Sequence, residues 1–160
     1  MDIMLRRLIA TSNDLTPMLL RLILGLVILP HGLQKAFGLF GGYGFTGTMT
    51  YFTDTLGIPY VFGVLAILAE LVGSLMLIFG ALSRLAAVGI GVTMLVAILT
   101  VHLPNGFFMN WFGNQKGEGF EYFLLAIGLS LGVMIQGSGA LSVDRFLSTK
   151  TARSREAIRA

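Results

Sequence analysis

The chain contains no cysteine and few charged residues. Only 12% of its 160 residues are charged, and there are two histidines and one tryptophan. The absence of cysteine excludes a thiolate nucleophile, a disulfide relay, a cysteine-ligated iron–sulfur cluster and a thioether-attached haem. Any redox chemistry would therefore need a bound cofactor or a partner.

The scarcity of charge is matched by an excess of hydrophobic residues, which make up 55% of the chain. A soluble core of this size cannot bury that much apolar surface, so we expect a lipid bilayer to be the solvent. Four apolar runs begin at Pro17, Pro59, Arg84 and Phe120. Each has about 18 to 22 residues, enough to cross a bilayer as a helix. The sequence predicts an all-α polytopic membrane protein, a bundle of four transmembrane helices.

The basic residues predict the topology. With both ends inside, the inner segments hold Arg6, Arg7, Arg84, Arg145, Lys150, Arg153, Arg155 and Arg159, whereas the outer loops hold only Lys35 and Lys116. We therefore expect a multi-pass protein of the cell inner (plasma) membrane with cytoplasmic termini, and we interpret Arg21 as a topology anchor. Residues 1–16 would be a cytoplasmic head, 17–147 the membrane domain and 148–160 a basic cytoplasmic tail. That tail is interpreted as a topology and anionic-lipid signal, so no nucleic-acid partner is expected.

Two segments outside the spans are amphipathic. In residues 41–57, Phe45, Met49, Phe52 and Leu56 recur at helical spacing, which predicts a short interfacial helix between the first and second spans. Residues 104–119 combine Trp111 with phenylalanines and amides, as is usual at the headgroup level. Both segments are compatible with membrane anchoring, or with a lid over an outward-facing cavity for a lipophilic ligand.

Glu70 is the most informative polar residue in the spans. It lies 11 residues after Pro59, about 16 Å along its helix, and therefore near the bilayer centre. It shares a helical face with small residues, Gly63, Ala66, Gly73 and Ser74, which favour close helix packing. We expect Glu70 to face inward and to be paired or protonated, because a bare carboxylate is costly in a membrane.

Further polar residues are predicted in the outer half. His31 and Lys35 are four residues apart with Gln34 beside them, just beyond a bend expected at Pro30. A stripe of Glu121, Leu125, Gly128 and Gly132 predicts that Glu121 also faces inward. His102 ends the third span, and its orientation is left open. Lys35 and Glu121 are equally compatible with snorkelling at helix ends, and His31 with packing.

The pattern of "HGLQK", "LAELVGSLMLIFGALSRLAA", His102, "GEGFEYFLL" and "GSGALSVDRFL" resembles the DoxX family of small bacterial four-helix membrane proteins, over residues 17–147. The resemblance implies a redox-associated membrane protein. Members are described as subunits of quinol oxidases or thiosulfate:quinone oxidoreductases, as components of complexes with superoxide-detoxifying and sulfur-transfer enzymes, or as candidate oxidoreductases. The positions that match are His31, Gly32, Gln34, Lys35, Glu70, Arg84 and Glu121, and the resemblance assigns none of them a role.

Two function classes are compatible with these residues. In an oxidoreductase or quinone-binding subunit, His31 and Glu70 would exchange protons with a quinone. The binding residues would be His31, Gln34, Lys35, Glu70, His102, Trp111 and Glu121. In the alternative, a non-catalytic scaffold or small-molecule carrier, the polar cluster fixes helix register and the cytoplasmic face recruits soluble redox enzymes. A haem or metal site between His31 and His102 is disfavoured because no ligand-spacing motif accompanies them. A homo-oligomer is compatible with both.

Overall fold

The computed structural model describes residues 3–150, which are built from helices and loops without a strand. The helices are α1 (Ile3–Ile9), α2 (Leu15–Phe37), α3 (Gly44–Thr50), α4 (Tyr60–Phe79), α5 (Ser83–Ala97) and α6 (Glu121–Gln136). Short turns add η1 (Leu39–Gly41), η2 (Tyr51–Thr55), η3 (Ile98–His102) and η4 (Leu103–Asn105). Residues 143–150 are helical as well. The predicted all-α class is confirmed.

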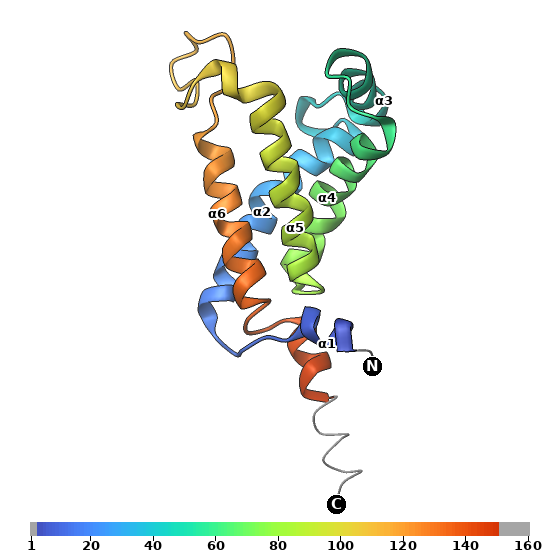
Figure 1. Ribbon diagram of the computed structural model, residues 1–160, viewed down its shortest axis with the longest axis vertical. Coiled ribbons are helices and arrows are strands. Elements are labelled where there is room, and N and C mark those ends of the chain that lie inside the picture. Colours follow the sequence, from blue (N-terminus) through green and yellow to red (C-terminus); the bar gives the residue numbers. More distant parts are fainter. Residues whose placement is uncertain (1–2, 151–160) are drawn as a thin grey trace, which may run out of the picture.

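Helices α2, α4, α5 and α6 lie side by side and pack in that cyclic order (Figure 1). Helix α1 and residues 143–150 lie at one end of these helices, which we call the terminal end. Helix α3 and the loop of residues 106–120 lie at the opposite end, which we call the loop end. Both ends of the described chain are thus on the same side of the helices.

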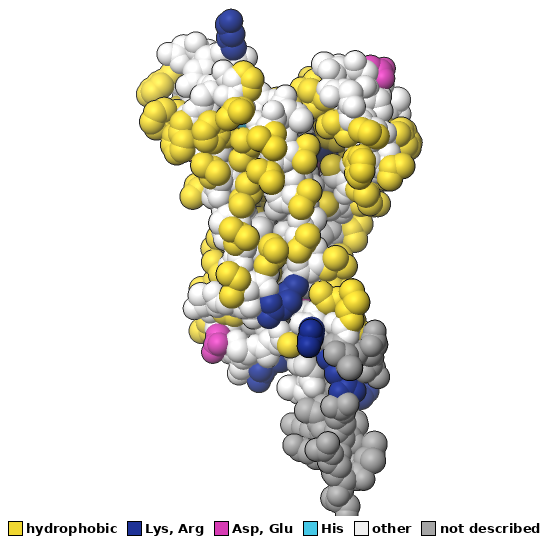
Figure 2. Space-filling model, viewed as in Figure 1, with side chains coloured by type: hydrophobic (Ala, Val, Ile, Leu, Met, Phe, Trp, Pro, Cys, Tyr) yellow, Lys and Arg dark blue, Asp and Glu magenta, His cyan; other side chains and the backbone are white. Residues whose placement is uncertain are grey.

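Three helical segments are long and apolar enough to cross a membrane: Leu15–Phe37, Tyr60–Phe79 and Ser83–Asn105. Helix α6 is apolar but has only 16 residues, about 24 Å of helix, so the fourth span stays a prediction. Figure 2 shows hydrophobic side chains along the visible sides of the helices and basic side chains gathered at the terminal end. This exposed apolar surface is characteristic of a protein surrounded by lipid.

Helices α2 and α4 approach closely because glycines on α2 carry no side chain. A Cβ on Gly32 would lie 2.7 Å from the Cα of Leu71 and 2.8 Å from the carbonyl carbon of Glu70. A Cβ on Gly25 would lie 3.0 Å from the carbonyl oxygen of Ser74. Only glycine permits this backbone contact. The close approach therefore occurs at the level of Glu70.

The face of α6 that packs inward differs from the predicted one. Its buried residues are Ala126, Ser130 and Val133, whereas Leu125 is 71% exposed and Gly128 is exposed too. The prediction that the stripe of Glu121 faces inward is therefore wrong. The face that carries the two glycines is packed only in part. A Cβ on Gly132 would lie close to Leu20 of α2, whereas nothing lies within 4 Å of a Cβ on Gly128.

The predicted helix between the first two spans is confirmed as α3 and the π-helical turn η2. Met49 is buried, and a Cβ on Gly63 of α4 would lie 2.9 Å from its methyl carbon. Phe45 is exposed. The position of this helix at a membrane surface stays a prediction. Helix α2 continues through Pro30 as far as Phe37.

The interpretation of Arg21 as a topology anchor needs correction, because this side chain is only 1% exposed. Its guanidinium donates to the carbonyls of Leu77 (2.8 Å) and Ile78 (2.6 Å) at the end of α4. It also donates to three carbonyls of the segment that follows α6, those of Ser138 (2.7 Å), Ala140 (3.2 Å) and Leu141 (2.8 Å). Arg21 therefore joins three parts of the chain at the terminal end.

Asp144 has a related structural role. Its carboxylate accepts hydrogen bonds from the backbone N–H groups of Leu82 (2.8 Å) and Ser83 (3.2 Å), where α5 begins. It also accepts one from the hydroxyl of Ser138, which lies 2.8 Å from the hydroxyl of Ser83. A carboxylate at a helix N-terminus satisfies N–H groups that have no partner within the helix. The "GSGALSVDRFL" segment thus fixes the terminal ends of α4 and α5.

Candidate functional site

The centre of the site is an ion pair between Lys35 and Glu70. Lys35 lies in the last turn of α2, and Glu70 lies in the middle of α4 with an exposed fraction of 2%. Gly32, one turn before Lys35, brings the backbone of α2 against Glu70 and Leu71. The ammonium of Lys35 donates to Oε2 of Glu70, so the buried carboxylate is compensated. The inward orientation of Glu70 was predicted and is confirmed.

Ser74 lies one turn after Glu70 and is completely buried. Its hydroxyl donates to the backbone carbonyl of Glu70 rather than to the carboxylate. Such a bond satisfies the hydroxyl within its own helix. Ser74 therefore does not compensate the Glu70 carboxylate, whose charge is paired with Lys35.

His31 and Tyr122 flank the ion pair. His31 lies on α2 one turn before Lys35, and its ring centroid is 6.0 Å from that of Tyr122 on α6. Both side chains lie close enough to Glu70 to interact with its charge. The hydroxyl of Tyr122 is buried and has no hydrogen-bond partner among the described residues. The site therefore combines a cation, a carboxylate, an imidazole and an unpaired phenol.

Sequence reasoning did not find Tyr122. A signal was present, because Tyr122, Ala126 and Val133 follow each other at helical spacing and form the inward face of α6. The glycines at positions 128 and 132 instead led to the prediction that Glu121 faces inward. The two residues are adjacent in sequence, but their side chains project from different faces of the helix.

Four of the predicted site residues organise the loop end instead. Glu121 accepts hydrogen bonds from the backbone N–H of Met109 (2.9 Å) and from Nε1 of Trp111 (3.1 Å). His102 contacts the carbonyl of Glu118 through Nδ1 at 2.8 Å. Gln34 donates to the carbonyl of Phe40 at 3.2 Å. These contacts fix the turn after α2 and the loop 106–120.

The two groups of residues are connected through aromatic rings. The ring of Tyr122 is 5.3 Å from that of Phe123, and Phe123 is 4.0 Å from the ring of His102. Two rings thus separate the histidines. Within residues 3–150, no set of three or more His, Asp or Glu side chains is placed to hold a metal ion.

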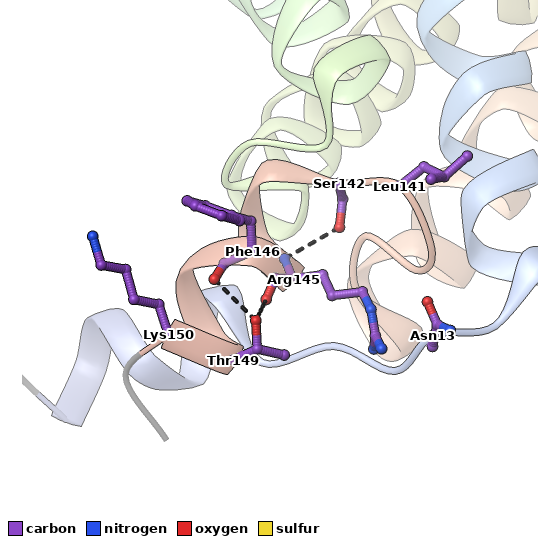
Figure 3. Close-up of a pocket in the computed structure, with 7 residues that line it drawn as sticks. All are labelled: Asn13, Leu141, Ser142, Arg145, Phe146, Thr149 and Lys150. Carbon is purple, nitrogen blue, oxygen red and sulfur yellow. Dashed lines mark hydrogen bonds between the residues drawn. The ribbon is translucent and has the colours of Figure 1, made fainter. Parts of the chain in front are cut away.

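An open pocket lies at the terminal end, whereas Lys35 of the ion pair lies in the last turn of α2, toward the loop end (Figure 3). It is lined by Asn13, Leu141, Ser142, Arg145, Phe146, Thr149 and Lys150. In Figure 3 the side chains of Arg145 and Asn13 approach each other across it, and Thr149 donates to the carbonyl of Arg145 at 3.0 Å. The predicted basic tail lies largely outside the described residues, since the structure describes the chain only to Lys150.

Residues 3–150 contain helices and no strand, and their long apolar helices, with a compensated carboxylate inside one of them, define a polytopic membrane protein. It belongs to the DoxX family, whose model matches residues 16–103, from α2 to the end of the third apolar segment. A similar protein is "Putative oxidoreductase CatD" of Bacillus subtilis (strain 168), which is 31% identical over 136 residues. The match covers 85% of this chain and 90% of that protein. No solved structure matches the chain.

Proposed function

We propose that the chain is a membrane redox protein in which Lys35, Glu70 and His31 bind the head group of a lipophilic quinone. The observation that carries this proposal is the Lys35–Glu70 ion pair, formed inside apolar helices with an imidazole and a phenol beside it. Charged groups at such a depth are costly, and they commonly serve a ligand or a proton path. The name of the Bacillus subtilis relative as an oxidoreductase supports the redox assignment.

The residue types suit quinone chemistry. A quinone carbonyl is a hydrogen-bond acceptor, and the ammonium of Lys35 and the imidazole of His31 are donors. Reduction of a quinone to a quinol takes up two electrons and two protons, one proton on each carbonyl oxygen. In this proposal the electrons come from a separate redox protein, and Glu70 and His31 transfer the protons. Residues Gln34, His102, Trp111 and Glu121 shape the loop end above the ligand.

The proposed topology places the terminal end in the cytoplasm of a plasma-membrane protein, with α6 as a fourth span. The basic residues Arg6 and Arg7 of α1, and Arg145, lie at this end and support that orientation. The terminal end is also where a soluble redox partner would bind.

A second candidate function is a non-catalytic scaffold. It is favoured by one observation, that Lys35 and Glu70 satisfy each other's charge without any ligand. In that case the ion pair fixes the register of α2 against α4, and function depends on partner proteins. The two candidates differ in whether a ligand accompanies the purified protein.

The test is gentle extraction of the full chain, followed by mass spectrometry of the lipids and quinones that copurify. We expect a quinone with the native protein, and its loss from Glu70→Gln and His31→Ala variants that keep native helical content. Glu118→Gln is the matched control, since Glu118 is an exposed carboxylate of loop 106–120. If the native protein carries no quinone and binds none when it is added, the quinone proposal is wrong and the scaffold function is left.

A further inference from the structure

We propose that the ligand enters sideways from the bilayer, through the loop-end half of the seam between α2 and α6, and that the Tyr122 hydroxyl donates a hydrogen bond to one of its carbonyl oxygens. This inference rests on the proposed quinone function and specifies the route and a further binding residue. It differs from access beneath the loop 106–120, because the opening faces the lipid rather than the loop end.

The α6 side of the seam is closed near the terminal end and open beyond it. At Gly132, a Cβ would lie 2.9 Å from a methyl group of Leu20 on α2. Leu125 lies seven residues earlier and therefore on the same face, two turns nearer the loop end. Its side chain is 71% exposed. This face of α6 is therefore packed against α2 at Gly132 and exposed two turns nearer the loop end.

The α2 side has the same pattern. Leu24 is buried in the core together with Ala126 and Val133 of α6. His31 lies seven residues later on the same face, yet it is exposed. In Figure 1, α2 and α6 cross near the terminal end and separate toward the loop end. On both sides of the seam, exposed side chains thus follow buried ones toward the loop end, and there the rings of His31 and Tyr122 lie 6.0 Å apart.

Tyr122 supplies a polar group on the α6 side of the seam, opposite His31 on the α2 side. Its hydroxyl is buried and unpaired among the described residues, although a buried phenol ordinarily has a hydrogen-bond partner. Its ring lies 6.0 Å from that of the exposed His31. A phenol donor opposite an imidazole fits a ligand with carbonyl oxygens at opposite ends of a flat ring. An acyl chain would leave both groups without a partner.

The first experiment compares Tyr122→Phe with Tyr60→Phe, a matched control at the exposed start of α4. The probe is a short-chain benzoquinone, and the readouts are its dissociation constant and the thermal unfolding midpoint with and without it. We expect Tyr122→Phe to weaken binding about tenfold, the effect of one lost hydrogen bond. Without quinone, its midpoint should equal or exceed that of the native protein, because an unpaired buried hydroxyl has been removed.

The second experiment tests the route. Leu125→Trp places a bulky ring in the seam, and Ile135→Trp places the same ring at a similarly exposed position of α6 near the terminal end. A photoreactive quinone should label the native protein and Ile135→Trp equally, and label Leu125→Trp several-fold less. Equal labelling of all three proteins would overturn the lateral route.

The outcomes separate the inference from the proposed function. If the benzoquinone binds the native protein and Tyr122→Phe equally well, the role of Tyr122 is wrong and the quinone function stands. If Tyr122→Phe is destabilised without quinone, its hydroxyl has a partner inside the protein, which also overturns the inference. If the native protein binds no quinone, the proposed function fails and the ligand assignment of Tyr122 fails with it.

Discussion

Replacing Lys35 should destabilise the protein more than replacing Glu70, its partner in the ion pair. Lys35→Met leaves the carboxylate of Glu70, whose side chain is 3% exposed, without its cation. Removing one partner of a buried pair costs about 3–5 kcal/mol. Because the Lys35 side chain is 28% exposed, we expect the lower end of this range. A loss of about 3 kcal/mol corresponds to roughly a hundredfold change in the unfolding equilibrium constant.

Glu70→Gln should cost less, because the freed Lys35 lies near a helix end and its ammonium reaches toward the headgroups. The double variant Lys35→Met/Glu70→Gln removes both charges and should recover to within about 1 kcal/mol of the native protein. The assay is unfolding in mixed micelles with increasing denaturing detergent, followed by far-ultraviolet circular dichroism.

Lys116→Met in the exposed loop is the matched control and should change the free energy of unfolding by less than about 0.5 kcal/mol. The reasoning is refuted if Lys35→Met costs as little as this control. The pair would then behave as a solvated surface pair, for which about 0–1 kcal/mol is usual.

Three further predictions concern the rest of the fold. Arg21→Lys should destabilise the protein by about 2 kcal/mol or more, because an ammonium cannot replace a planar guanidinium that donates to five carbonyls. Thermal unfolding measures the change, and a midpoint equal to that of the native protein would contradict the prediction. Gly32→Ala should destabilise the protein by about 1–3 kcal/mol, because the added methyl group forces α2 away from α4. Gly128→Ala should be neutral or stabilising, because the space around its Cβ is open. Equal unfolding midpoints for the two variants would refute the close approach of α2 and α4. Glu121→Gln should shift the fluorescence of Trp111, the single tryptophan, while costing less than about 1 kcal/mol; an unchanged emission spectrum would show that Glu121 does not hold the indole.

The helices and the orientation of Glu70 were predictable because they depend on local pattern. Apolar runs of spanning length and the small residues around Glu70 report on one helix at a time. Glu70 was expected to be paired or protonated, and in the structure it is paired with Lys35. The bilayer leaves a buried carboxylate few ways to be satisfied.

The errors arose where two environments produce the same local pattern. A glycine stripe can mark either a packed face or an exposed one, and on α6 it was largely the exposed one. An arginine near the end of a span can anchor the helix in headgroups or be buried among carbonyls, and Arg21 is buried. Helical spacing could have placed Tyr122 on the inward face of α6, but its place beside His31 could not be predicted, because that contact joins two helices that are distant in the sequence.

The hydrogen bonds of Arg21 bear on the order in which the protein is assembled. Arg21 lies in the first long helix, and its acceptor Ser138 comes 117 residues later. During synthesis, this guanidinium must enter or approach the membrane long before the ribosome has produced three of its five acceptors. The terminal end therefore closes only when the segment after α6 arrives, so a chain that stops before Ser138 presents an unsatisfied charge to lipid or to quality-control proteases. Through this one side chain, completion of the polypeptide is coupled to completion of the fold.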